Sequence, residues 1–153
     1  MKPVSDTLDS AIIALAKSLP YHGEASAPNS WKALQAWAKN HTVGVDSLPV
    51  FNGGGENTIY GSQGVNIAQR ALHDSHHIGI VRGFDLASEI AVAESQADQL
   101  RAFGCSQTDC ELLVADIVAQ AEHWGRHRRY VVDQRSFVLA WLSNPSTALN
   151  KVW

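Results

Sequence analysis

Apolar residues recur at spacings of three and four along most of the chain, a pattern that predicts amphipathic helices rather than strands. In the first such segment Leu8, Ile12, Leu15 and Leu19 lie at helical spacing, and Pro20 ends it. Similar segments follow, separated by short stretches that contain Gly, Pro or Asp. The predicted helices span residues 6–18, 31–41, 62–78, 86–103, 107–128 and 134–143, and a short helical turn is expected at 148–153.

Capping residues set the predicted helix boundaries. Short polar residues that can satisfy a free backbone N–H precede the second, fourth and sixth helices, namely Ser30, Asp85 and Asp133. The fifth helix is expected to begin near Ser106 or Thr108, since both start a capping-box pattern. Gly79 and Gly104 are placed to end the third and fourth helices.

No alternating run of apolar and polar residues is long enough to indicate a strand. The expected fold is therefore all-α, a single bundle-like domain of five or six helices spanning residues 1–153. One long irregular connection, residues 42–61, contains three successive glycines, Gly53 to Gly55. It lacks the Gly-Lys-Ser/Thr of a phosphate loop. Because a loop of this length in a compact domain is often functional, we expect it to lie as a flap beside a site.

Composition narrows the class of protein. The chain has 153 residues, 45% hydrophobic and 18% charged, as expected of one folded domain rather than a disordered chain. A formal net charge of −3 disfavours nucleic acid as a partner. Without a long apolar run or a secretory signal, no membrane association is expected. Cys105 and Cys110 lack a second pair to complete a zinc cluster, so reduced thiols in a cytoplasmic protein are favoured.

Two predicted helices carry polar residues at the same offsets, 0, 4, 7 and 11, which fall on one narrow side of a helix. The first polar stripe is Asn66, Arg70, His73 and His77, and the second polar stripe is Asp116, Gln120, His123 and His127. Each stripe ends in a His-x-x-x-His pair. The match predicts two helices that face each other across one polar site.

Imidazoles four residues apart can bind one metal ion from a single helix turn. Glu89 is the carboxylate of the fourth helix best placed to join them. The sequence therefore predicts a divalent metal ion, of unknown identity, held by His73, His77, Glu89 and His123, with His127 as an alternative ligand. Asn66, Gln96 and Gln120 could orient the imidazoles. A structural hydrogen-bond network is the alternative interpretation of these side chains.

Further residues receive roles around this predicted centre. Asp74 or Asp116 is expected to orient or deprotonate an attacking water, and Arg70 and Arg126 to neutralise a phosphate. Arg126 belongs to the basic cluster 126–129, for which stabilisation of the helix C-terminus is the favoured alternative. Asp133 is favoured as a helix cap over a metal ligand. Three histidines are placed outside the predicted ligand set: His76 beside it or exposed, and His22 and His41 at the surface.

With these residues identified, the chain resembles a group of small uncharacterised proteins from tailed phages and prophages. The resemblance is carried by Tyr60; by 70–74 with His76 and His77; by 83–86 with Glu89, Ala93 and Gln96; and by 132–137. It covers about the second two-thirds of the chain. It implies a phage setting, hence the cytoplasm of a host cell, and a common site, but no particular reaction.

A weaker resemblance is to the HD superfamily of metal-dependent phosphohydrolases, which are all-helical. It is carried by His41, the adjacent pair His73-Asp74, and either Asp116 or Asp133, in that order. Two features depart from the family pattern. Ser75 and two histidines follow the pair in place of an Ile-Gly-Lys-like turn. Adjacent residues also differ by about 100° on a helix, so both can face one metal ion only at a helix end or kink.

Together these patterns favour a metal-dependent hydrolase acting on a nucleotide or another phosphorylated small molecule. The alternative is a non-catalytic phage protein that binds and inhibits a host protein, such as a defence component, with the histidines as a structural network. A DNA-associated protein that uses residues 126–129 is a third, weaker hypothesis.

Overall fold

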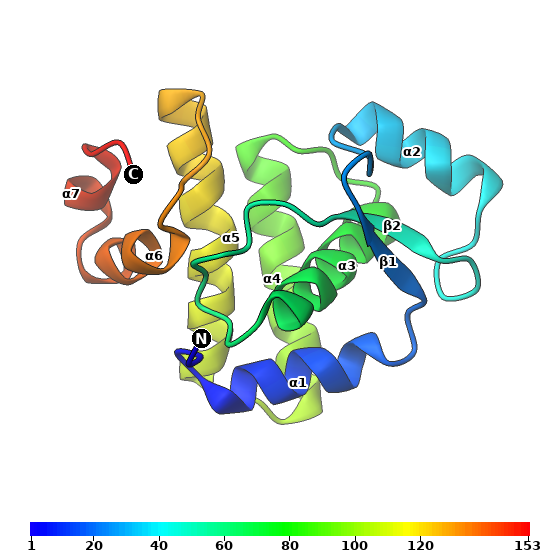
Figure 1. Cartoon of the computed structure of the whole chain (residues 1–153), viewed down its shortest axis with the longest axis horizontal. Coiled ribbons are helices and arrows are strands. Elements are labelled where there is room, and N and C mark those ends of the chain that lie inside the picture. The colour runs from blue at the N-terminus through cyan, green and yellow to red at the C-terminus, as the bar shows by residue number, and fades with distance from the viewer.

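The computed structural model describes residues 1–153 as a predominantly helical domain with one small sheet (Figure 1). Seven helices and two strands follow one another in the order α1 (Asp6–Ala16), β1 (Tyr21–Glu24), α2 (Trp31–Asn40), β2 (Leu48–Phe51), α3 (Gln63–Ile80), α4 (Leu86–Phe103), α5 (Gln107–His127), α6 (Gln134–Ser143) and α7 (Pro145–Leu149). The expected all-α class is confirmed in that helices form the body of the domain.

A side-chain oxygen caps the start of every helix. The N-caps of α1 to α7 are, in order, Ser5, Ser30, Ser62, Asp85, Ser106, Asp133 and Asn144, and each accepts a hydrogen bond from a backbone N–H in the first turn. The predicted caps are therefore confirmed, and the choice at α5 falls on Ser106 rather than Thr108. Gly104 ends α4 with a φ of 103°, the left-handed conformation that glycine adopts without strain.

Two predicted helix ends are wrong. Gly79 lies inside α3, which continues to Ile80 and ends at Val81 in the left-handed conformation. The last helix, α7, begins at Pro145 and ends at Leu149, so it precedes most of the segment expected to form a helical turn. Proline is well suited to the first turn of a helix, because its missing N–H has no partner there.

The small sheet contradicts the expectation of a strand-free chain. Strands β1 and β2 pair in parallel, with Tyr21 opposite Leu48 and Glu24 opposite Phe51. Each strand has only four residues, too few to show an alternating pattern. The parallel pairing also depends on α2 as the crossover between the strands, a non-local arrangement that local sequence patterns do not reveal. The sheet divides the predicted 42–61 connection, whose irregular part is the Gly-rich segment after Phe51.

Helices α4 and α5 form an antiparallel pair at the centre of the molecule, and they pack against each other more extensively than any other helices (Figure 1). Helix α3 packs across α4, and α1 covers α3. Helix α2 and the sheet lie beside α3, and α6 and α7 lie beside α5. Large, fully buried apolar side chains come from most of these elements, among them Ile12, Leu34, Leu48, Leu100, Leu113 and Phe137. No helix has both the length and the apolar character needed to cross a membrane.

Candidate metal centre and its cavity

Three potential metal ligands converge where α3 crosses α4. His73 and His77, one turn apart on α3, bring their Nε2 atoms to 3.0 Å from each other. One carboxylate oxygen of Glu89, Oε2, lies 3.1 Å from His73 Nε2 and 3.4 Å from His77 Nε2. A tetrahedral ion with bonds of about 2 Å separates neighbouring ligand atoms by roughly 3.3 Å. The three atoms thus have the spacing that one metal ion requires, and they form the only such group in the chain.

The backbone fixes which nitrogen of His77 faces the group. His77 Nδ1 lies 3.0 Å from the carbonyl oxygen of Arg82, which can only accept a hydrogen bond, so Nδ1 carries the proton. In the neutral ring the lone pair is then on Nε2, directed at Glu89. A carbonyl that orients an imidazole in this way is a regular feature of metal-binding histidines.

Gln96 takes the corresponding position beside His73. It lies two turns after Glu89 on α4 and is close enough to His73 to contribute to the raised pKa of that imidazole. His73 Nδ1 and Gln96 Oε1 are both fully buried, and neither atom has a hydrogen-bond partner in the structure. Gln96 is thus found beside His73, as predicted, and its role in orienting the imidazole stays a prediction.

Three lone-pair atoms this close repel one another unless a cation lies between them. Burial by itself would raise the pKa of Glu89, but the hydrogen bonds and positive charge of His73 and His77 lower it to about 2. Burial likewise disfavours a charged His73, yet Glu89 outweighs it and raises the pKa of His73. The carboxylate is therefore ionised at neutral pH, and the group attracts either a proton or a metal ion.

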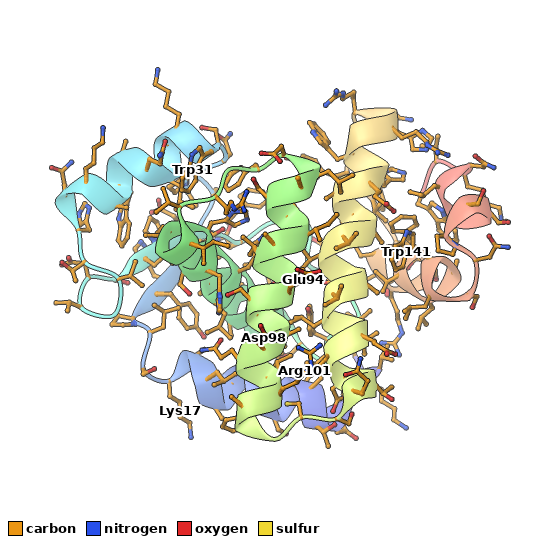
Figure 2. All side chains as sticks on the ribbon, turned by 180° about the vertical axis from the view of Figure 1, so that it is seen from behind. Lys17, Trp31, Glu94, Asp98, Arg101 and Trp141 are labelled. Carbon is orange, nitrogen blue, oxygen red and sulfur yellow. The ribbon has the colours of Figure 1, made fainter.

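One side of this group opens onto a cavity of about 720 Å³ between α3, α4 and α5. His73 and Glu89 line it, while His77 is completely buried behind them. Trp31, at the start of α2 (Figure 2), lines the cavity next to His77. Phe84 lines it too, with its ring 4.8 Å from that of His77. The three candidate ligands thus lie on one side, and the other side is open. Catalytic metal sites typically have this arrangement, whereas structural sites are closed.

The other half of the cavity contains the first two members of the second polar stripe. Asp116 is buried, accepts a 2.9 Å hydrogen bond from the Tyr60 hydroxyl and a 2.8 Å bond from Gln120 Nε2, and interacts electrostatically with Arg70 and His73. Burial raises its pKa to about 6 despite these partners. Asn66, Arg70 and His73 face it from the first stripe. These halves of the two stripes therefore share one site.

The last two residues of the second polar stripe, His123 and His127, do not line the cavity and do not join the candidate ligand group. The predictions for them as metal ligands are therefore wrong. His123 bonds the Arg129 carbonyl through Nδ1 at 3.1 Å and packs against the Phe137 ring. His127 Nε2 contacts the Leu149 carbonyl at 2.8 Å. Both histidines hold the α6–α7 segment against α5, a structural role. Arg126 also lies outside the cavity and donates to Asn150, which contradicts a phosphate contact there.

Arg70 lines the cavity, but its guanidinium is already engaged. It donates to the carbonyl oxygens of Phe51, Gly53 and Gly54 at 2.8, 2.7 and 3.3 Å. Arg70 therefore holds the Gly-rich segment against α3 beside the site, where a flap was expected. The same segment covers Asn66, whose buried Nδ2 has no partner and faces Gly55.

Other candidate residues lie outside the ligand group. Asp74 is on the flank of α3 and does not line the cavity; burial raises its pKa to about 6. Asp133 caps α6, as favoured over metal binding. His76 bonds Ser95 and Gln99 on α4. The two histidines expected at the surface, His22 and His41, are exposed. The structure does not gather His41, Asp74 and Asp116 with His73 into one set of potential ligands.

Several residues of the site have no signal in the sequence pattern. Gln69 lines the cavity one turn before His73 and is buried, although it falls just beside the predicted stripe. The Arg82 carbonyl is a backbone group, and no side-chain pattern can indicate it. Trp124 and Tyr130, stacked with ring centroids 4.7 Å apart, also line the cavity. In the sequence, the only indication of these two residues is that they are aromatic and lie close to the end of the second polar stripe.

Comparison with protein-family models, with curated proteins and with solved structures finds no match for this chain. The candidate site therefore rests on its own geometry.

Proposed function

We propose that the chain binds one divalent metal ion through His73, His77 and Glu89 and uses it to hydrolyse a small molecule held in the adjoining cavity. The observation that supports this most directly is the convergence of three candidate ligand atoms within 3.0–3.4 Å, with the imidazole of His77 oriented by the Arg82 carbonyl behind it. Two nitrogens and one carboxylate oxygen form a ligand set that zinc commonly accepts.

The donor set and its surroundings favour a metal ion over a purely structural network. A structural network would consume the polar atoms facing it, yet His73 and Glu89 remain open to the cavity. An ion in this position supplies Lewis acidity, which lowers the pKa of a water and polarises a scissile bond. The surrounding residues would then hold the substrate and move the protons.

Asp116 is the candidate general base. Its pKa of about 6 keeps it largely ionised at neutral pH while leaving it basic enough to accept a proton from water. Tyr60 and Gln120 fix the orientation of its carboxylate. Asp74, the other predicted candidate, does not line the cavity, so Asp116 is preferred.

A phosphorylated substrate stays a prediction with less support than the metal. Of the two arginines predicted to bind phosphate, Arg126 lies outside the cavity and Arg70 donates to the Gly-rich segment. Arg128 is the other cationic side chain at the cavity. The host-cell cytoplasm remains the expected location only through the resemblance to phage proteins.

Metal binding can be tested with an internal control, because the chain contains two His-x-x-x-His pairs of similar ring separation, 4.5 Å in the first and 4.6 Å in the second. We expect Zn²⁺ to bind the parent protein with a stoichiometry near one in calorimetric titrations. His73→Ala and Glu89→Gln should each weaken binding at least tenfold, whereas His127→Ala should leave it unchanged. Equal binding by all four proteins would refute the assignment.

Hydrolysis requires a separate measurement. The zinc-loaded protein is incubated with a panel of chromogenic phosphate and carboxylate esters and with amides, and Asp116→Asn and Glu89→Gln are compared with the parent. Metal-dependent turnover of at least one class that both substitutions reduce by 100-fold or more would agree with the proposal. Stoichiometric zinc without turnover of any class would leave a metal-binding protein and exclude hydrolysis of such bonds.

A further inference from the structure

The cavity is lined by amide side chains that each keep at least one hydrogen-bonding atom without a partner in the protein. Gln69 is only 4% exposed and lines the cavity, yet its amide makes no hydrogen bond with the rest of the chain. Its amide atoms are not among the fully enclosed ones, so the remaining exposure leaves them open to the cavity. Amide atoms that face a cavity bond water when the cavity is empty, and a molecule that displaces this water has to supply equivalent hydrogen bonds. The Gln69 amide therefore favours a ligand with polar groups at this position.

Two further amides present acceptors to the same space. Gln120 uses its Nε2 to bind Asp116, and Gln134 uses its Nε2 to bind the Gly54 carbonyl. Both side chains line the cavity, and the oxygen of each amide has no partner in the protein. Gln69 offers both a donor and an acceptor. The three amide oxygens can accept from N–H groups of a ligand, and the Gln69 NH₂ can donate to a carbonyl or ring nitrogen on the same edge.

Two pairs of aromatic side chains at the cavity suit a flat molecule. Trp31 and Phe84, whose ring centroids are 6.3 Å apart, form one aromatic pair, and Trp124 and Tyr130 form another. All four rings line the cavity. Aromatic faces bind planar, π-bonded ligands by stacking, and Tyr130, at 77% exposure, has most of its surface free for such a contact.

From this combination we infer that the cavity binds a neutral planar heterocycle with an amide-like edge, the chemical class of the nucleobases. Stacking on the aromatic side chains and pairing with Gln69, Gln120 and Gln134 hold the ring. The inference rests on the proposed function only for the hydrolysis of the bound ligand, since none of these contacts involves the metal. The volume of about 720 Å³ is ample for a nucleoside.

Calorimetric titration of the protein, in chelator and again with Zn²⁺, tests this inference. The probes are adenosine, guanosine, cytidine and uridine, with ribose and ribose 5-phosphate as ligands that lack the base. We expect at least one nucleoside to bind the metal-free protein at least tenfold more tightly than ribose 5-phosphate. If all four nucleosides bind no better than ribose, the inference is wrong.

Two variants identify the site. Gln69→Ala is expected to weaken nucleoside binding at least fivefold, the effect of about one lost hydrogen bond. Gln107→Ala, which removes an exposed glutamine at the start of α5 paired with Glu111, should have no effect. Gln120→Ala replaces Gln69→Ala if the latter fails to fold. Equal binding by the cavity variant and the control would overturn the assignment.

The two proposals fail separately. Nucleoside binding by metal-free protein that also binds no Zn²⁺ would support the heterocycle site and refute the metal centre. Stoichiometric zinc with no preference for nucleosides would refute the heterocycle site and leave the metal centre intact. Tighter binding of ribose 5-phosphate than of any nucleoside would also overturn the heterocycle inference, and would favour the phosphorylated ligand predicted from the sequence.

Discussion

Val81 shows how a single strained residue supports the candidate metal centre. It ends α3 with a φ of 54°, although it is β-branched and such residues strongly avoid the left-handed conformation. The turn at Val81 folds the chain back, so that the Arg82 N–H bonds the His77 carbonyl and the Arg82 carbonyl meets His77 Nδ1. Backbone strain of this kind persists where the surrounding structure imposes it, often at functional sites.

Replacing Val81 by glycine should stabilise the protein. The left-handed conformation destabilises an L-residue by about 1–2 kcal/mol, and glycine avoids this cost. Glycine in turn destabilises the folded state by about 0.5–1 kcal/mol, because its unfolded chain is more flexible. We expect a net gain of about 0.5–1 kcal/mol in the free energy of unfolding, read as a rise of roughly 1–4 °C in Tm. Val81→Ala retains the Cβ and is the control. A Val81→Gly protein that melts at or below Val81→Ala would show that Val81 is not strained.

At this residue scale the sequence predicts the candidate metal ligands best where helix geometry alone decides. His73 and His77 share one turn of one helix, so their convergence follows from their spacing. Glu89 joins these histidines as predicted, because it is the carboxylate of α4 at the edge of the apolar face, while its role as a metal ligand stays a prediction. The error at His123 has another cause, because its distance from His73 depends on how α3 and α5 are arranged, which side-chain periodicity does not report.

The two polar stripes show the same limit at the scale of elements. Asp116 and Gln120 face the first stripe across the cavity, as predicted, but one turn later α5 is covered by α6 and α7. There Trp141 of α6 (Figure 2) donates to Glu122 at 2.8 Å. His123 contacts Phe137 of α6, and His127 contacts the Leu149 carbonyl of α7. Periodicity identified the polar side of α5 correctly but not which neighbour covers each part of it. The strands were missed because their pairing is also a contact between distant segments.

Arg70 connects two elements, and its replacement should loosen one of them. Its guanidinium is bonded to three carbonyls of residues 51–54, so Arg70→Met keeps the aliphatic stem but removes those bonds. We expect a loss of about 2 kcal/mol in stability and at least tenfold faster hydrogen–deuterium exchange in peptides covering residues 51–62, with α4 unchanged. The exposed Arg101, paired only with Asp98, provides the control Arg101→Met. Unchanged exchange at 51–62 would mean that Arg70 does not hold the segment.

At the scale of the whole molecule, a buried acidic group couples folding to pH. Asp116, on α5, accepts a hydrogen bond from Tyr60, which is fully buried with a pKa raised well above its usual value by burial and by Asp116. The Tyr60 hydroxyl therefore remains a donor at all ordinary pH values. Asp116, with a pKa of about 6 in the folded protein against 3.8 normally, binds its proton more tightly when the chain is folded.

This difference fixes the direction of the pH dependence. Between about pH 4 and pH 6 the folded state holds more protons on Asp116 than the unfolded state does, so the free energy of unfolding falls as pH rises through this range. A shift of about two pKa units corresponds to at most about 3 kcal/mol. Glu89, whose pKa is lowered from 4.5 to about 2, makes stability rise with pH, and it does so mainly below pH 4.5. Asp74, whose pKa is also raised to about 6, adds to the fall.

Asp116→Asn should reduce this pH dependence without abolishing it. Urea unfolding in the presence of chelator, at half-unit steps from pH 4 to pH 7.5, should show that the stability of the parent protein falls relative to that of the variant, which retains Asp74, as pH rises from about 4 to 6. The variant is expected to be less stable at pH 5, because an amide cannot accept from both Tyr60 and Gln120 as the carboxyl group does. Asp98→Asn, at an exposed site on α4, should follow the parent curve. If stability changes with pH in the same way in the parent and in Asp116→Asn, the pKa of Asp116 is not raised by folding. Asp116 would then not be suited to act as a general base near neutral pH.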